Sequence, residues 1–195
     1  MSTRLLVLGC VRAFQPIHGY DVRRELMSWH ANEWANVAPG SIYNALKSLV
    51  KDGALEVVGT KAVGGRPERT TYKLTKRGED ELVDLLRDTW WNVKPIQDPL
   101  MCGLAFLNMM TRDESIAALE HRAAQIKSQL AQAEFLIASL GTDGDLGDEH
   151  VREMMRLSCA RAEAEMAWSQ AFIARLRRGE YTTLGDKLPK KSGKR

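Results

Sequence analysis

Hydrogen-bonding and basic side chains gather on one side of a helix predicted to begin near Pro39 and end at Gly53. The apolar positions recur with helical spacing and predict a buried stripe of Ile42, Leu46, Leu49 and Val50. The outward positions are left to Ser41, Tyr43, Asn44, Lys47, Ser48 and Lys51. They include no carboxylate, and a surface that meets phosphates must avoid carboxylates because each would repel the phosphate charge. The pattern favours a helix that reads DNA, although an ordinary solvated helix face has the same outline.

The outward side chains have distinct capacities toward a duplex. Asn44 can pair bidentately with adenine, and Lys47 can reach guanine acceptors or phosphate. Ser41 and Tyr43 can donate to phosphate oxygens, contacts that set the register of a protein on DNA rather than its sequence preference.

A ribbon of two short strands, predicted over residues 55–58 and 71–74, follows this helix. The segment between the strands holds the cations Lys61, Arg66 and Arg69, and its two adjacent glycines at 64–65 let it bend freely. An arginine beside glycines at a hairpin tip can enter a narrow minor groove. The alternative is a merely basic surface hairpin. Helix and ribbon together predict a winged helix, in which the helix enters the major groove and the tip reaches phosphate or the minor groove.

Other elements must position this helix and ribbon. Apolar spacing predicts helices over residues 5–14, 20–29 and 75–91, with a loop over 30–37 that carries Trp34. Pro95 and Pro99 mark a boundary. We therefore predict a winged-helix domain at 1–92, a linker at 93–98, a helical domain at 99–178 and a disordered basic tail at 179–195.

Two long helices are predicted in the second half of the chain. A capping box of Thr111 and Glu114 begins the first, which runs to about Leu140, and the second spans about 148–178. Their apolar stripes are Ile116, Leu119, Ala123, Ile126, Leu130, Ala133 and Ile137 on the first, and Val151, Met154, Met155, Leu157, Ala164, Trp168, Phe172 and Leu176 on the second. Helices of 28–30 residues would be about 40–45 Å long, more than a small core needs. The same pair from a second copy is the expected partner, which predicts a homodimer.

Charge is unevenly distributed along the 195 residues, whose formal net charge is only +3. Residues 1–79 hold 12 Lys/Arg and 7 Asp/Glu, residues 80–180 hold 11 and 17, and residues 181–195 hold 5 and 1. The first part is therefore expected to meet a polyanion and the acidic middle is not.

The three cysteines, Cys10, Cys102 and Cys159, are odd in number and far apart, so neither a disulfide framework nor a zinc site is predicted. This usage favours the cytoplasm. The apolar run after Arg4 is too short for a signal peptide, and no run approaches the roughly 18 residues of a membrane span, so no membrane partner is expected.

Catalytic and cofactor patterns find little support. Neither Gly-x-Ser-x-Gly nor His-Glu-x-x-His occurs, and the glycines at 59 and 64 are followed by Gly65-Arg66 where a phosphate loop needs Lys and Ser/Thr. His18 and His30 lie near Asp21 and Glu33 in the sequence, but a regulatory metal site there is a minor alternative. We expect no enzyme activity, no cofactor and no metal.

Taken together, these motifs resemble the PadR family of bacterial transcriptional regulators. The matching residues are Leu6-Val7-Leu8-Gly9, His18-Gly19-Tyr20-Asp21-Val22, Ser41 to Leu49, Gly53-Ala54-Leu55, Gly65-Arg66-Pro67, Tyr72-Lys73-Leu74-Thr75 and Gly78. The two long helices resemble the dimerisation domain of the family branch in which that domain is larger. The resemblance implies a homodimeric repressor released from its operator by a small molecule. It also implies DNA contacts for Tyr43 and Arg66, and phosphate contact at the start of the second helix, Gly19-Tyr20.

Two positions depart from the family pattern. Ala38 stands where the family often has a hydroxyl N-cap, and Asn44 stands where proline is common. The operator sequence should therefore not be carried over.

The sequence predicts a mainly α protein, with an N-terminal winged helix-turn-helix and a C-terminal long-helix dimerisation domain. The expected function is sequence-specific binding of double-stranded DNA. The predicted contacts are Tyr20, Ser41, Tyr43, Asn44, Lys47, Lys61, Arg66 and Arg69. Trp90, Trp91 and Trp168 are candidates for binding a small planar aromatic effector, the alternative being that they pack in the dimer core or over the linker. A winged-helix module that binds protein, a small-molecule enzyme with a helical lid, and an activator rather than a repressor remain the alternatives.

Overall fold

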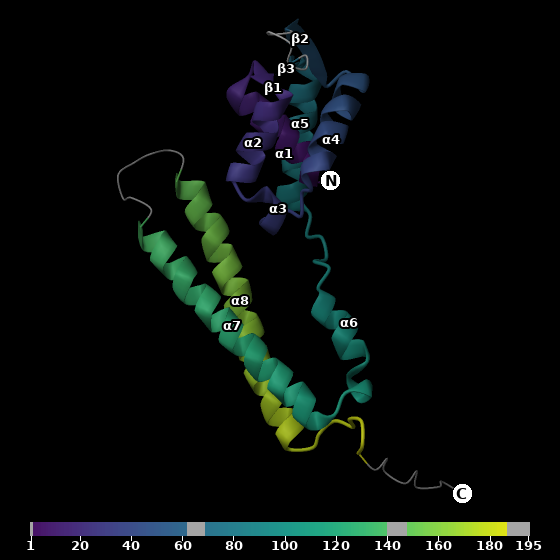
Figure 1. Ribbon diagram of the computed structural model, residues 1–195, viewed down its shortest axis with the longest axis vertical. Coiled ribbons are helices and arrows are strands. Elements are labelled where there is room, and N and C mark those ends of the chain that lie inside the picture. The colour runs from purple at the N-terminus through teal and green to yellow at the C-terminus, as the bar shows by residue number, and fades with distance from the viewer. Residues whose placement is uncertain (1, 62–68, 140–147, 187–195) are drawn as a thin grey trace, which may run out of the picture. The chain divides into compact units, whose positions relative to one another are not determined.

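The computed structural model describes residues 2–61, 69–139 and 148–186, and the chain divides into two compact units. The first unit spans Met1–Ile96 and the second Gln97–Arg195. Figure 1 shows short helices and a small sheet in the first unit and long helices in the second. The sequence-predicted basic tail lies largely outside the described residues, which end at 186.

The first unit packs short helices around one core. These helices are α1 (Ser2–Phe14), α2 (Gly19–Ser28), α3 (Ala31–Trp34), α4 (Pro39–Lys51) and α5 (Lys76–Trp91). All five helices contribute buried side chains to this core, α5 only through its first half. The fully buried side chains include Leu8, Val22, Leu26, Ile42, Leu46 and Leu49. Three of these come from the predicted inward stripe of α4, so that stripe is confirmed, with Val50 only partly buried at its end.

Helix α3 corrects the sequence prediction of a plain loop over 30–37. Trp34 donates a hydrogen bond from its ring Nε1 to the carbonyl oxygen of Trp29 at 2.7 Å. His30 (φ 54°) and Asn36 (φ 52°) adopt left-handed backbone conformations on either side of this turn. Four residues are too few for an apolar period to be visible in the sequence, which is why the helix was missed.

Local signals fix the ends of α4 and α5. Pro39 occupies the first turn of α4, and Gly53 follows its C-cap with φ +73°, a conformation that glycine adopts without strain. Thr75 caps α5, because its Oγ1 accepts a hydrogen bond from the Gly78 amide at 3.1 Å. Gly78 is required there, since a Cβ would lie 2.1 Å from the carbonyl oxygen of Ala54.

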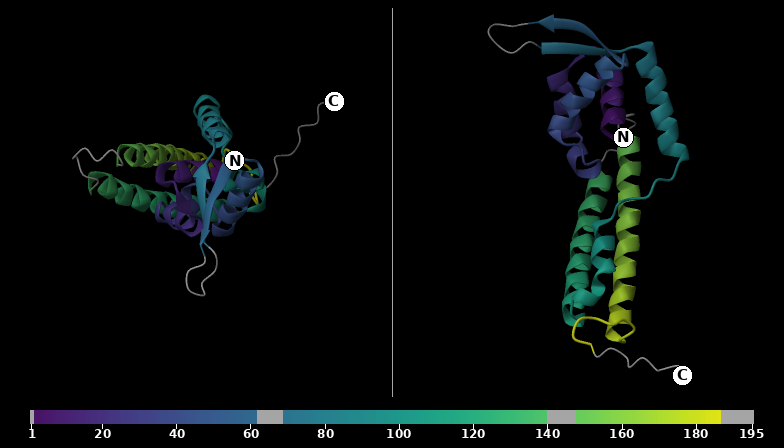
Figure 2. Two further views of the ribbon diagram at one scale, coloured as in Figure 1. Left: turned by 90° about the horizontal axis from the view of Figure 1, so that it is seen from above. Right: turned by 90° about the vertical axis from the view of Figure 1, so that its right-hand side faces the viewer.

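The sheet has three antiparallel strands in the order β1-β3-β2, where two were predicted. Strands β2 (Leu55–Lys61) and β3 (Arg69–Leu74) form the expected ribbon, with an irregularity in register between Val57 and Gly59. The added strand is β1 (Ile17–His18), which pairs with β3. Figure 2 shows β2 and β3 extending as a narrow ribbon from the first unit.

The second unit is an antiparallel helix pair with a short helix beside one end. It comprises α6 (Pro99–Ala105), the 3-10 turn η1 (Leu107–Met109), α7 (Arg112–Ser139) and α8 (Asp148–Arg177). Both Figure 1 and the right view of Figure 2 show α7 and α8 side by side along their length. The predicted capping box is confirmed: Glu114 accepts from the Thr111 amide at 3.1 Å, and Thr111 Oγ1 accepts from the Glu114 amide at 3.3 Å.

The inward face of α7 is the predicted one, whereas that of α8 is predicted only in part. Leu119 and Ile126 are buried, as the α7 stripe predicts, and Leu119 packs in one cluster with Phe172 and Leu176 of α8. On α8, Phe172 and Leu176 are buried, but the predicted members Val151, Met154 and Leu157 are exposed. The inward positions of that half of α8 are Arg152, Met155, Cys159 and Ala162. Of these only Met155 belongs to the predicted stripe; because the set includes an arginine, apolarity alone placed the rest of this half of the stripe on the exposed side.

Candidate nucleic-acid interface

The outward face of α4 carries the residues predicted to read DNA. Tyr43 is 39% exposed, and Asn44 and Lys47 are also exposed. They are held there because Ile42, Leu46 and Leu49 fix the opposite face in the core. This is the amphipathic arrangement in which one stripe packs and the other is free to meet a partner.

Ser41 has a second role. Its hydroxyl donates to the carbonyl oxygen of Ala38 at 2.7 Å, and Ala38, the N-cap residue, offers no side-chain cap. Ser41 is half-buried. Its hydroxyl therefore braces the first turn of α4, and a phosphate contact from it would have to replace or share that hydrogen bond.

The cations of α4 have no carboxylate partner in the part of the chain that the structure describes. Among the described residues no ion pair involves Lys47 or Lys51. The carboxylate at the end of the helix, Asp52, is paired with Arg4 at 2.7 Å. The hydrogen bond from Arg4 lowers the pKa of Asp52 below its usual value, so that carboxylate keeps its charge but has a cation beside it. The exposed face of α4 is consequently electropositive before Asp52.

The start of α2 lies against α4 because residue 19 is glycine. A Cβ at Gly19 would lie 3.1 Å from Tyr72 Cε2 and 3.3 Å from Leu46 Cδ1, with Tyr43 Cε1 at 3.9 Å. The tight fit brings the first turn of α2 next to Tyr43. Tyr20, in that turn, is 58% exposed. Tyr20 and Tyr43 thus flank one surface of the first unit.

The predicted wing cations fall mostly outside the described residues. Arg66 lies in the segment 62–68, and nothing is described of the side chains of Lys61 and Arg69. The backbones of Lys61 and Arg69 are paired across the ribbon and form its last register pair.

Several polar contacts that fix the wing root and α4 were missed at the sequence level. Gln15 Oε1 accepts from the Leu74 amide at 2.8 Å, and His18 Nδ1 lies 2.9 Å from Thr71 Oγ1 in a shared hydrogen bond. Both join residues more than 50 positions apart, so no local pattern signals them. Arg4 makes the most extensive of these contacts.

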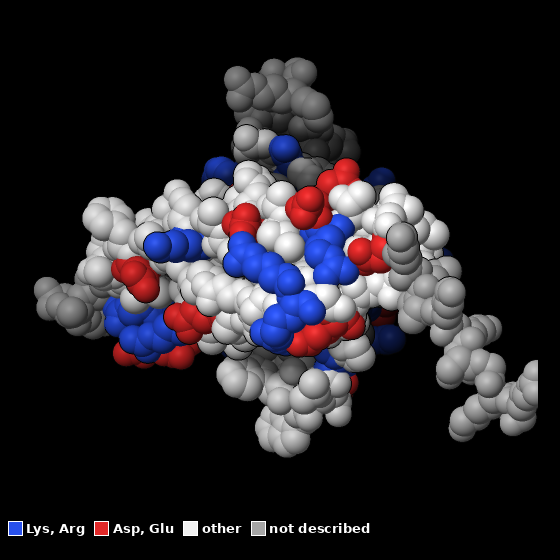
Figure 3. Space-filling model, turned by 90° about the horizontal axis from the view of Figure 1, so that it is seen from below, with Lys and Arg blue, Asp and Glu red and all other residues white. Residues whose placement is uncertain are grey.

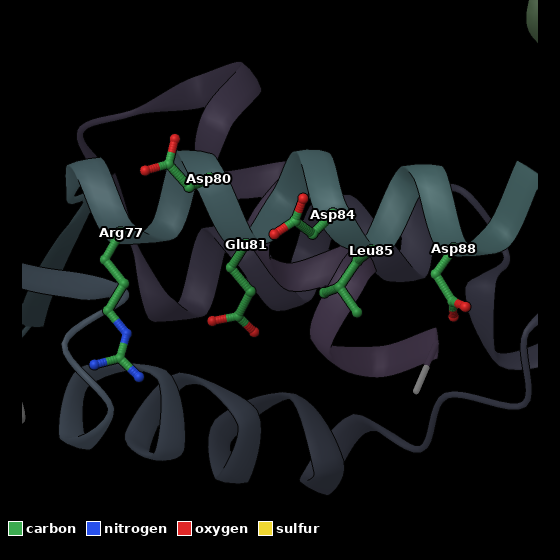
Figure 4. A pocket seen from close by; sticks show the side chains of 6 residues that line it. All are labelled: Arg77, Asp80, Glu81, Asp84, Leu85 and Asp88. Atoms are coloured by element: carbon green, nitrogen blue, oxygen red, sulfur yellow. The ribbon is translucent and has the colours of Figure 1, made fainter.

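A shallow groove of about 510 Å³ runs along α5 and is lined mainly by acids. Figure 4 shows Arg77, Asp80, Glu81, Asp84, Leu85 and Asp88 along this helix. A groove with this charge repels phosphate, so it lies outside the candidate nucleic-acid surface.

The three tryptophans considered for effector binding differ in environment. Trp90 and Trp91 end α5 and are 82% and 79% exposed. Trp168 is half-buried against Phe172, with ring centroids 5.2 Å apart, in the core of the second unit. Successive residues of a helix point about 100° apart, so Trp90 and Trp91 cannot clasp a flat ligand between their own two rings.

The end of the second unit where α7 begins and α8 ends has a mixed charge. Figure 3 shows Lys and Arg atoms beside Asp and Glu atoms on this face. Ion pairs there include Arg112–Asp186 at 2.7 Å and Arg177–Glu120 at 2.6 Å. Internal pairing of this kind leaves little net field for a polyanion.

The described residues contain neither a candidate metal site nor a candidate membrane-spanning helix. No three or more His, Cys, Asp or Glu side chains in that part of the chain are grouped so as to hold a metal ion. Within the same residues, none of the helices combines the length and apolarity needed to cross a bilayer.

Comparison with known proteins gives a family match within the first unit and similar solved structures over nearly the whole chain. Residues 7–84 match the sequence model of the transcriptional regulator PadR-like family. The structure of Bacillus subtilis PadR in complex with operator DNA has a TM-score of 0.68 and 21% identity, over 90% of this chain and 99% of that chain. The same protein in complex with p-coumaric acid has a TM-score of 0.68 and 18% identity, over 91% and 99%.

A third relative extends the likeness beyond that protein. The PadR-like regulator BC1756 of Bacillus cereus has a TM-score of 0.59 and 15% identity, over 91% of this chain and 99% of that chain. At these identities the solved structures show a shared fold along nearly the whole length. No curated protein sequence matches the chain.

Proposed function

We propose that this chain belongs to the PadR-like family of transcriptional regulators. On that premise, it is a homodimeric, cytoplasmic repressor that binds a duplex operator. The single observation that carries the proposal is the exposed face of α4. Tyr43, Asn44 and Lys47 face outward there, Lys47 has no ion-pair partner among the described residues, and Asp52 is held by Arg4. Such a face suits the major groove, where amide and ammonium groups reach base edges.

The remaining predicted contacts support this placement. Tyr20 beside Tyr43 would bind phosphate and set the register, while Lys61, Arg66 and Arg69 at the wing would reach the backbone or the minor groove. In a dimer the two copies of α4 would enter successive major grooves about 34–36 Å apart. The operator is therefore expected to be a pseudo-palindrome.

Release of the operator is assigned to a small planar aromatic effector that contacts Trp90 or Trp91. Their exposure leaves both rings available for stacking. Because the two rings diverge on α5, the opposite wall of the site must come from another segment or a second copy. Trp168 already packs against Phe172, so it would contribute only if the core of the second unit opened. The similarity to a protein solved with p-coumaric acid supports an aromatic acid as the first compound to test.

Binding to duplex DNA tests the proposal through the double variant Lys47→Ala/Arg66→Ala. Wild-type protein should bind its promoter fragment with an affinity that falls steeply as salt rises, because cations released from phosphate drive binding. The double variant should bind at least about tenfold more weakly, and each lost phosphate contact should reduce the log–log salt slope by about one. Fluorescence anisotropy across a salt series measures both quantities.

The matched control is Lys76→Ala on α5. The Lys76 side chain is 85% exposed, is paired with Asp80 at 2.6 Å and belongs to α5, so it is not part of the outward face of α4. This variant should bind as the wild type does. Absence of duplex binding by the wild type even at low salt would instead favour a winged-helix module that binds protein.

A further inference from the structure

Arg4 joins three helices of the first unit through one guanidinium group. It lies on α1, and its Nη1 donates to Asp52 Oδ2 at 2.7 Å, beyond the last turn of α4. Its Nη2 donates to Glu81 Oε2 at 2.9 Å on α5, and its Nε donates to the other oxygen of the same carboxylate. A weaker contact of 3.4 Å reaches Ser48 Oγ on α4. Because Nε and Nη2 pair with Glu81, Nη1 remains free to bind Asp52 at the end of α4.

This geometry depends on the shape of arginine. A planar guanidinium with donors on several edges can grip one carboxylate bidentately and still reach a second. The Glu81 hydrogen bond raises the pKa of Arg4 above its usual value, and the Arg4 hydrogen bond lowers that of Asp52. The side chains of Arg4 and Glu81 are only 30% and 24% exposed, so solvent screens this pair less than a surface pair.

The exposed face of α4 is the surface that the proposed function uses, and its C-terminal end is where Arg4 acts. Ser48 and Asp52 lie one turn beyond Asn44 and Lys47 along the helix. The backbone leaves α4 through Gly53 into β2. Backbone hydrogen bonds and one bond from Thr75 Oγ1 to the carbonyl oxygen of Gly53, at 2.7 Å, also hold this end, but Arg4 is the contact that ties it to both α1 and α5. Ser48 Oγ also lies 3.2 Å from Asp52 Oδ2, which completes a small network around the guanidinium.

A second ion pair between the same two helices provides an internal comparison. Arg12, also on α1, donates from Nε to Glu79 Oε2 of α5 at 2.8 Å. Like Arg4 it carries one positive charge and links α1 to α5. Among the described residues Arg12 makes no ion pair with α4, and its side chain is 57% exposed.

We propose that Arg4 is a positioning residue for DNA reading: it fixes the C-terminal end of α4 to α1 and α5 without touching the duplex. The inference rests on the proposed function for its effect on binding, but it also makes a claim about the free protein. Loss of Arg4 should loosen the end of α4, spread the orientations of Asn44 and Lys47, and so weaken binding indirectly.

Paired variants Arg4→Gln and Arg12→Gln test this inference, because each removes one charge and one α1–α5 ion pair. Couplings of this kind typically change an affinity by about two- to thirtyfold, so Arg4→Gln should weaken duplex binding by about fivefold and Arg12→Gln by less than about twofold. The salt slope should stay at the wild-type value in both, because neither residue contacts phosphate. Arg4→Lys should fall between them, since an ammonium cannot span both carboxylates.

Hydrogen exchange in the absence of DNA gives the second readout. The amides of Asp52, Gly53 and Ala54 bond to the carbonyls of Ser48, Val50 and Leu49 at 2.8–3.0 Å and report the integrity of this helix end. They should exchange faster in Arg4→Gln, and in Arg4→Lys if the first variant does not fold, but not in Arg12→Gln.

The outcomes separate the two proposals. Equal effects of Arg4→Gln and Arg12→Gln on affinity and exchange would overturn the positioning role. A salt slope lowered by about one in Arg4→Gln would also overturn it, because it would show a direct phosphate contact. If wild-type protein bound no duplex, the proposed function would fail, whereas faster exchange at residues 52–54 in Arg4→Gln alone would still support the structural claim.

Discussion

At the scale of single residues, one carboxylate holds the end of the described chain to the start of α7. Asp186 accepts from Thr183 Oγ1 at 2.6 Å, from the Thr183 amide at 2.7 Å and from Arg112 Nη2 at 2.7 Å. Hydrogen bonds lower the pKa of Asp186 from 3.8 to about 2. The bond from the Thr183 side chain has the largest effect, followed by those from the Thr183 amide and from Arg112. Arg112 also donates to the carbonyl oxygen of Leu176 near the end of α8, so the network closes the open end of the helix pair.

The direction of this pKa shift sets a pH dependence. A carboxyl whose folded pKa lies below its unfolded value stabilises the fold fully above the unfolded pKa. The contribution of Asp186 is therefore complete above pH 3.8 and is lost as the pH falls toward about 2. We expect the Thr183 amide to lose protection from hydrogen exchange, corrected for intrinsic rates, across that interval.

Asp186→Asn should remove this pH dependence and leave the Thr183 amide weakly protected at every pH. Glu180→Gln is the control, because the Glu180 carboxylate pairs with Arg178 at 2.7 Å and lies in the same segment. If Asp186→Asn kept the wild-type protection at pH 6, the carboxylate would not be what holds this segment.

At the scale of elements, α5 is apolar on two sides. Leu82 and Leu85 pack into or against the core of the first unit. Val83, Leu86 and Trp90 follow at helical spacing on another side and are exposed. A helix that needs only one face for its own core has a second face available for a ligand or another chain.

The effector proposal predicts that Trp90→Ala or Trp91→Ala weakens binding of p-coumaric acid. Loss of one stacking ring typically costs about 0.5–1.5 kcal/mol, which corresponds to roughly two- to tenfold in affinity. Isothermal titration calorimetry measures the change directly. Both side chains are almost fully exposed, so these substitutions should leave the fold intact.

Trp34→Ala on α3 serves as the comparison, since Trp34 is a half-exposed tryptophan in a different part of the first unit. It should bind the acid with wild-type affinity. Equal loss in all three variants would point to a nonspecific effect, and no loss in either α5 variant would remove these rings from the effector site.

At the scale of the whole molecule, the second unit leaves apolar side chains of both long helices uncovered in a single chain. Phe135 and Leu136 on α7 and Val151, Met154 and Leu157 on α8 are between 36% and 74% exposed. The short helix α6 and η1 cover only the other end, where Leu104 and Leu107 pack near Trp168. Exposed apolar side chains in such number favour an interface, and the proposed homodimer supplies one.

The homodimer predicts a particle of twice 21.9 kDa in solution. The variant Met154→Glu/Leu157→Glu should dissociate the dimer. Each chain would lose two apolar contacts worth about 1.5–3 kcal/mol each, and two charged side chains would be buried in their place. The dissociation constant should rise by more than about a hundredfold. Sedimentation velocity over a concentration series measures this change.

Gln170→Glu, an exposed polar site on the same helix, should leave the particle mass unchanged. A wild-type mass of one chain at high concentration would contradict the homodimer. A double variant that remained dimeric would show that the interface lies on another face of the unit.

Much of the fold is encoded in short stretches of sequence. Gly53 and Thr75 end and begin their helices through contacts within a few positions, and the Thr111–Glu114 capping box does the same for α7. Apolar spacing likewise revealed the inward stripe of α4, and with it the side that carries Asn44 and Lys47. These signals are local because a helix turn joins residues three or four apart.

Tertiary structure alone decided the features that depend on distant partners. Arg4 meets Asp52 and Glu81 across 48 and 77 positions, and the two-residue strand β1 exists only because β3 is beside it. The inward face of α8 near Arg152 could not be read from apolarity, since a polar side chain lies among the inward positions there. Sequence periodicity indicates which side of a helix or strand is buried. The residues against which that side packs are determined only by the tertiary fold, because they come from distant parts of the chain.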